Sequence, residues 1–222
     1  MLDGLMRRLI DPPLSRAGAA LARYGVGADA VTFLGLATGI GCAAAIAFRA
    51  DALALALLAA SRLCDGLDGA IARARGKTDR GGFLDIVFDF VFYGAVPLAF
   101  ALRDPETFAL PAAVLLFSFY VNGASFLAYA AVAAKRGLES KVRGIKSIYF
   151  TIGLAEGTET IVAFALMILV PAWFPIIAYF FAGLTIMTAL ARISLAWGVF
   201  RDDPEDEAAQ TQDPPAPPTP RA

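Results

Sequence analysis

Six long apolar stretches dominate the sequence and limit what the chain can fold into. They cover residues 30–48, 52–73, 82–102, 108–133, 148–170 and 174–198. A helix needs about 20 apolar residues to cross the hydrocarbon core of a bilayer, and it satisfies its own backbone hydrogen bonds there. We therefore predict an all-α membrane protein in which residues 26–200 form six transmembrane helices.

The two ends of the chain differ from this apolar body. Residues 1–25 place apolar side chains three and four positions apart, a spacing that predicts a short amphipathic helix on the membrane surface. Its apolar stripe consists of Leu2, Leu5, Met6 and Leu9. Residues 201–222 are rich in acidic residues and proline, and this composition predicts a disordered tail.

The distribution of positive charge predicts the orientation of the chain. Most of the 19 Lys and Arg residues fall in the N-terminal segment and in the loops at 74–80 and 135–147, whereas Arg49 and Arg103 stand on the opposite side. The positive-inside rule then places both termini and these two loops in the cytoplasm. A chain that is 58% apolar with a net charge of −1 is not a nucleic-acid-binding protein.

Four aspartates near the cytoplasmic ends of the second and third predicted spans carry the strongest functional signal. Each costs about 2.5–3.5 kcal/mol to place within a membrane helix. Asp65 and Asp68 are three residues apart and Asp85 and Asp89 are four apart, so each pair shares a helix face. Because a short loop joins the two spans, we expect the four carboxylates to meet. Hard oxygen donors favour Mg²⁺ or Mn²⁺, so the pattern predicts a two-metal site for phosphoryl transfer.

The residues around the aspartates indicate a substrate that carries phosphate. Gly66 and Gly69 lack side chains, which would let a ligand approach the backbone, and Arg73 and Thr78 are donors suited to phosphate oxygens. In a competing interpretation the aspartates only pair with nearby cations. Those cations are Arg62, Arg73, Arg75, Lys77 and Arg80. Four acids with interleaved glycines favour the metal site.

The aspartate segment reads Asp65-x-x-Asp68-Gly69-x-x-Ala72-Arg73, then seven residues, then Gly81-x-x-x-Asp85-x-x-x-Asp89. This pattern resembles the signature of the CDP-alcohol phosphatidyltransferases, and over about residues 1–200 the chain is most similar to a bacterial inner-membrane branch of that family. It departs from the family in two places. The family usually has eight residues before the glycine, and it often has Pro-Asn where this chain has Ala28-Asp29.

The resemblance implies a role for each matching residue. Asp65, Asp68 and Asp85 would hold two Mg²⁺ or Mn²⁺ ions, and Asp89 would contact a metal and act as general base on the acceptor hydroxyl. The contacts to the CDP group would come from Asp29, Thr32, Gly69, Arg73 and Thr78. The substrates would be CDP-diacylglycerol or a related CDP-lipid and a small alcohol. The resemblance also implies a homodimer in the bacterial inner membrane with its active site facing the cytoplasm.

Two other functions fit part of the pattern. A prenyltransferase of the UbiA type also places Asp-x-x-Asp pairs at helix ends, but it lacks the Asp-Gly-x-x-Ala-Arg run. An ion or proton transporter would use the acids as a relay, although a relay is expected to spread them across the membrane. The acceptor alcohol stays open. Glu156 and Glu159 either line its pocket, together with nearby cations, or are neutralised internally by Arg192 or Lys146. The nearby cations are Lys135, Arg143, Lys146 and Arg192.

Overall fold

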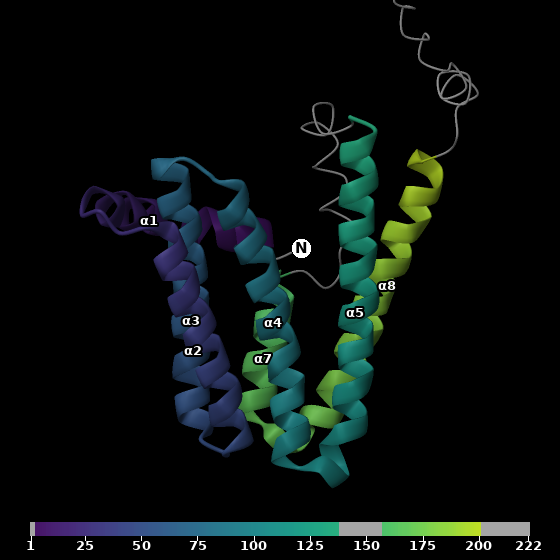
Figure 1. Ribbon diagram of the computed structural model, residues 1–222. Helices are drawn as coiled ribbons and strands as arrows, with labels where there is room; N and C mark the ends of the chain where they lie inside the picture. Colours follow the sequence, from purple (N-terminus) through teal and green to yellow (C-terminus); the bar gives the residue numbers. More distant parts are fainter. Residues whose placement is uncertain (1–2, 138–156, 201–222) are drawn as a thin grey trace, which may run out of the picture.

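The computed structural model describes residues 3–137 and 157–200, and within these ranges every regular element is a helix (Figure 1). The helices are α1 (Asp3–Arg23), α2 (Ala28–Ala47), α3 (Asp51–Arg75), α4 (Asp79–Arg103), α5 (Pro105–Lys135), α7 (Gly157–Leu169) and α8 (Phe174–Val199), with a short 3-10 turn η1 at Pro171–Trp173. The all-α class is thereby confirmed. The predicted tail and residues 148–156 of the predicted fifth span lie outside the described residues.

Local sequence signals set the ends of α3 and α4. Gly76 ends α3 with a φ of 103°, a value that glycine adopts without strain. Thr78 caps α4, because its hydroxyl oxygen accepts a hydrogen bond of 3.0 Å from the Gly81 N–H. Only residues 76–78 separate the two helices. Such a short connection makes α3 and α4 antiparallel neighbours.

Four helices are long and apolar enough to cross a membrane, namely α2, α4, α5 and the segment Pro171–Val199 that contains α8. Their outward faces carry exposed apolar side chains, such as Phe33, Leu98, Phe117 and Phe180. Large exposed apolar surfaces are unusual on water-soluble proteins and suit contact with lipid. The protein is therefore a multi-pass membrane protein. The predicted count of six spans depends on α3, which has charged residues, and on α7, which has 13 described residues.

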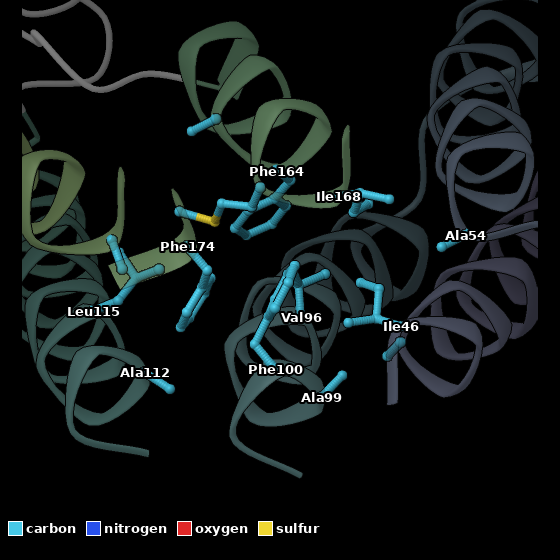
Figure 2. Close-up of a cluster of buried hydrophobic side chains, with 14 of the residues drawn as sticks. Ile46, Ala54, Val96, Ala99, Phe100, Ala112, Leu115, Phe164, Ile168 and Phe174 are labelled. Atoms are coloured by element: carbon cyan, nitrogen blue, oxygen red, sulfur yellow. The ribbon is translucent and has the colours of Figure 1, made fainter. Parts of the chain in front are cut away.

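The main hydrophobic core lies toward the end of the bundle where α3 begins and α4 ends. Phe100 near the end of α4 stacks on Phe174 at the start of α8, with ring centroids 4.2 Å apart. Figure 2 shows these rings together with Ile46, Ala54 and Phe164, which come from three further helices. The core therefore closes one end of the bundle, and it leaves the other end, where α3 meets α4, for the polar residues.

Helix α1 lies across the end of α2 and α3 that is remote from this core (Figure 1). It is a single helix of 21 residues that continues through Pro12 and Pro13, longer than the short helix that the sequence predicts. It packs against α3, and the closest approach is at Gly18, where a Cβ atom would lie 2.5 Å from the Cβ of Ala70. The predicted membrane-facing apolar stripe involves side chains outside those that the structure describes, and it stays a prediction.

We expect the Gly18→Leu substitution to loosen the packing of α1 on α3. A larger side chain would clash with both the Cβ and the backbone of Ala70, and overpacking of this kind costs about 1–3 kcal/mol. The matched control is Ala19→Leu, because Ala19 is the next residue of α1 and is exposed. Thermal unfolding in detergent should show a lower midpoint for Gly18→Leu only. Equal midpoints would contradict the observed packing.

Candidate active site

One pocket contains all four predicted aspartates. It is formed by α2, α3 and α4. Its lining residues are Thr32, Gly35, Leu36, Arg62, Asp65, Asp68, Asp85, Phe88, Asp89 and Phe92. The pocket therefore combines acidic side chains from α3 and α4 with apolar side chains from α2 and α4.

Helix geometry explains why the four carboxylates meet. Asp68 lies seven residues before the end of α3 and Asp85 lies six residues after the start of α4, which corresponds to about 10 Å from the connecting loop on each helix. Asp65 and Asp89 each lie ten residues from the same loop, about 15 Å along the helices. The antiparallel helices thus place Asp68 and Asp85 at one distance from the loop and Asp65 and Asp89 at a second, greater distance.

The four carboxylates are close enough to repel one another in every pairwise combination. Asp68 is the most deeply placed, with 5% of its surface exposed. Asp65 and Asp89 are partly buried, with side-chain exposures of 39% and 33%. Carboxylates gathered in this way repel one another, and positive charge nearby offsets that repulsion.

Arg62 of α3 supplies part of that positive charge. Its Nη1 atom donates a hydrogen bond of 3.1 Å to Oδ1 of Asp89 and lies 3.7 Å from Oδ2 of Asp65. Its Cζ atom lies 4.4 Å above the ring of Phe92. The interpretation in which nearby cations pair with the aspartates is therefore correct at Arg62. The sequence offered Arg62 as one of five possible partners of the aspartates, and its spacing of three residues from Asp65 did not distinguish it from the others.

The donor set fits divalent cations in its chemistry. Four carboxylates with hard oxygen atoms line the pocket, and among the described residues that line it only Arg62 carries positive charge. No three Asp, Glu or Cys side chains within the described ranges are already arranged as a metal cage. The Arg62 guanidinium lies within 4 Å of both Asp65 and Asp89. The site is a shared acidic pocket whose side chains require adjustment to ligate an ion.

The residues predicted to contact nucleotide divide into two groups. Thr32 lines the pocket together with the aspartates. The others lie nearer the α3–α4 loop: Arg73 is exposed beside Gly69, and Thr78 caps α4. Asp29 at the start of α2 pairs with Arg80, and its Oδ1 atom lies near Gly81, 3.6 Å from where a Cβ would stand. These residues border the loop end of the bundle, outside the pocket lining.

Two glycines next to the site serve the packing of helices. A Cβ at Gly66 would lie 2.6 Å from Cδ1 of Leu14 in α1, so the expectation that Gly66 admits a ligand is wrong. At Gly35 a Cβ would lie 3.2 Å from the Cβ of Cys64. The Ser61 hydroxyl donates a hydrogen bond of 2.9 Å to the Gly35 carbonyl. These contacts hold α2 against α3 and thereby place Thr32 in the pocket.

Arg192 of α8 bonds to neutral groups of α5. Its Nη1 atom donates to the Asn122 carbonyl at 3.1 Å, to the Asn122 side chain at 2.9 Å and to the Ser125 hydroxyl at 2.8 Å. Within the described ranges no carboxylate pairs with it, so the predicted pairing with Glu159 is not observed. Glu156 lies outside the described residues.

Comparisons with known proteins agree on one family. A family model for CDP-alcohol phosphatidyltransferases matches residues 26–199. Inner membrane protein YnjF of Escherichia coli is 44% identical over 193 residues, covering 87% of this chain and 94% of that protein. An archaetidylinositol phosphate synthase of Pyrococcus horikoshii is 30% identical over 118 residues, covering 53% of this chain and 63% of that protein.

A solved structure has the same fold. It is the crystal structure of the Mycobacterium tuberculosis phosphatidylinositol phosphate synthase PgsA1 with CDP-DAG bound. Its TM-score is 0.66 with 19% sequence identity, and the match covers 86% of this chain and 98% of that chain.

Proposed function

The chain belongs to the CDP-alcohol phosphatidyltransferase family, and from this premise we propose how its acidic pocket serves the transfer. The protein is a membrane phosphatidyltransferase that moves a substituted phosphate group from a CDP-linked lipid to an alcohol in phospholipid biosynthesis. The observation that carries the proposal is the meeting of Asp65, Asp68, Asp85 and Asp89, the four acids of the family signature, in one pocket. Neither prenyl transfer nor ion transport accounts for this match.

Asp65, Asp68, Asp85 and Asp89 hold two Mg²⁺ or Mn²⁺ ions in this proposal. Their oxygens are hard donors that suit these cations, and their mutual repulsion favours the binding of positive charge. When bound, the cations supply charge neutralisation for the donor diphosphate and for the departing CMP. Asp68 is the most buried of the four, with 5% of its surface exposed.

The donor lipid binds at the loop end of the bundle. Arg73 beside Gly69 is a donor for the phosphate oxygens. Thr32 lies in the pocket wall and donates its hydroxyl proton to the Ala28 carbonyl, so its oxygen is placed to accept a hydrogen bond from a ribose hydroxyl. Thr78 and Asp29 flank the start of α4 and complete the nucleotide contacts. Gly69 supports this placement. Among the described residues, a Cβ there would meet only the Arg73 side chain, at 3.4 Å, so the backbone is accessible.

Asp89 is the general base. It accepts the proton of the acceptor hydroxyl, whose oxygen forms a bond to the lipid-linked phosphorus. The bond from that phosphorus to the bridging oxygen breaks, and CMP leaves. The absence of histidine from the sequence agrees with a carboxylate base. Asp89 is one-third exposed at its side chain, so an acceptor from water can reach it.

The proposal includes six spans, with α3 and α7 in addition to the four apolar segments. Helix α3 has 25 residues, or about 38 Å, which is enough to cross the hydrocarbon core. The excess of basic residues at the loop between α3 and α4 supports a cytoplasmic active site.

The protein forms a homodimer in the bacterial inner membrane. Its mass in detergent micelles, measured by light scattering, tests the dimer.

Arg192 is the cation that recognises the acceptor, and the acceptor is a phosphorylated alcohol. Three neutral groups hold its Nη1 atom, and no carboxylate neutralises it within the described part of the chain. A cation in an apolar helix that has only neutral partners among the described residues attracts an anion. The name of the Pyrococcus horikoshii relative, archaetidylinositol phosphate synthase, supports an acceptor of this class.

Incubation with CDP-diacylglycerol, Mg²⁺ and a panel of alcohols tests the proposed function. We expect CMP release and a new phospholipid with a phosphorylated alcohol, and little product with its unphosphorylated counterpart. Release of diphosphate from a prenyl diphosphate, with no reaction of CDP-diacylglycerol, would contradict the proposal. The product is identified by mass spectrometry of the extracted lipids.

The Arg192→Gln variant tests the acceptor assignment separately. We expect the KM for a phosphorylated acceptor to rise by about tenfold or more, as for loss of one charged hydrogen bond, while the KM for CDP-diacylglycerol stays unchanged. The control is Arg49→Gln, an arginine near the opposite end of the bundle whose Nη2 atom bonds to a backbone carbonyl. An unchanged acceptor KM in Arg192→Gln would exclude this role.

A further inference from the structure

Arg62 joins the two helices that carry the acidic pocket. Its Nη1 atom lies within reach of Asp89 of α4 and Asp65 of its own helix α3, at 3.1 and 3.7 Å. With 19% of its side chain exposed it is the more buried member of both ion pairs. Arg62 thus lines the same pocket as the four carboxylates and lies next to Asp65 and Asp89, the pair farther from the α3–α4 loop.

The other cations near the loop do not line the pocket. Arg75 donates to the backbone carbonyls of Gly25 and Val26, and Arg80 pairs with Asp29. Arg73 is exposed at the end of α3 and does not line the pocket. Arg62 is consequently the cation that compensates the pocket within the described residues. A single positive charge against four carboxylates leaves the pocket strongly acidic.

The remaining contacts of Arg62 are weak or incomplete. Its Nη2 atom donates to the Ser61 hydroxyl at 3.2 Å, and its guanidinium lies over the Phe92 ring. Its Nε atom is buried and has no hydrogen-bond acceptor among the described residues. A buried donor without a partner is costly. Arg62 therefore stays in place mainly through its attraction to Asp65 and Asp89, and its hold weakens when those carboxylates are neutralised in another way.

We infer that Arg62 is a built-in counter-cation that competes with the divalent ions for Asp65 and keeps Asp89 oriented for its role as base. This inference rests on the proposed function. In the ion-free protein the guanidinium bridges the two carboxylates and reduces their repulsion. Bound divalent ions would draw Asp65 away from Arg62, and Arg62 would keep its closer contact, the hydrogen bond to Asp89. Arg62 is a positioning residue, because it acts through Asp89 and Asp65.

Two variants of Arg62 test this inference through metal binding as well as turnover. Arg62→Gln removes the competing charge, so we expect it to bind Mn²⁺ about tenfold more tightly in a titration followed by electron paramagnetic resonance. The same variant should lower kcat by about tenfold or more without changing the KM for CDP-diacylglycerol. Arg62→Lys keeps the charge but loses the planar fork, so it should bind Mn²⁺ like the wild type with a reduced kcat.

The control is Arg103→Gln. Arg103 pairs with Asp51 and also joins α3 to α4, but at the opposite end of both helices. Its loss should lower thermal stability and leave the Mn²⁺ affinity and kcat unchanged. If Arg62 were only a structural tie between the helices, Arg62→Gln would resemble this control, and unchanged or weaker Mn²⁺ binding would overturn the inference.

The outcomes separate this inference from the proposed function. If the wild type binds no Mn²⁺, the proposed metal site fails; if it binds Mn²⁺ and Arg62→Gln binds no more tightly, only the role of Arg62 fails. Arg62→Met, which is apolar and of similar length, replaces the Gln variant if that one does not fold. If neither folds, Arg62→Lys decides alone, since a wild-type kcat in it would overturn the inference.

Discussion

Replacing Asp89 with Asn is expected to lower the rate of CMP release by about 10²–10⁴-fold, the contribution that general acid–base catalysis commonly makes. The amide has nearly the shape of the carboxylate, but it does not accept the proton of the acceptor hydroxyl. Binding of CDP-diacylglycerol should largely remain, because the proposed nucleotide contacts lie nearer the α3–α4 loop. Steady-state assays of CMP release, together with thermal stabilisation by CDP-diacylglycerol, measure the two effects.

The matched control for this variant is Asp79→Asn. Asp79 belongs to the same helix α4, is exposed in its first turn and does not line the pocket. The account predicts an unchanged rate for this control. A rate of CMP release in Asp89→Asn within twofold of the wild type would show that another group takes the proton.

The second large effect is expected at Asp68. Asp68 has only 5% of its surface exposed. A neighbouring side chain or a water molecule therefore has little room to take its place as a ligand. We expect Asp68→Asn to raise the Mg²⁺ concentration for half-maximal activity by at least about 10–100-fold, the range seen when even the outer partners of metal ligands are removed. A titration of CMP release with Mg²⁺ measures this change. Asp79→Asn should keep the wild-type requirement, and an equal requirement in Asp68→Asn would remove this residue from the site.

Much of the fold follows from the sequence, because membrane helices are specified by long apolar runs. The predicted spans at 30–48 and 82–102 correspond to α2 and α4 within a few residues at each end. The meeting of the four aspartates was also predictable. It depends on helix periodicity and on one short loop, both of which are local properties.

Contacts between distant parts of the chain were not predictable in the same way. Gly66 has the same appearance in the sequence whether it faces a ligand or Leu14, and only the docking of α1 on α3 decides between them. The position of Arg62 was visible, but its choice of Asp89 depends on how α3 and α4 face each other. The two residues are 27 positions apart, and no local pattern connects them.

The central claim is that Asp65, Asp68, Asp85 and Asp89 jointly hold two divalent cations in one pocket. The most direct test is diffraction from crystals of the protein with Mn²⁺ and CDP-diacylglycerol, measured so that manganese is located by its anomalous scattering. The account predicts two manganese peaks per chain, each within about 2.5 Å of carboxylate oxygens from these aspartates. A structure with bound CDP-diacylglycerol and no manganese at these residues would contradict it.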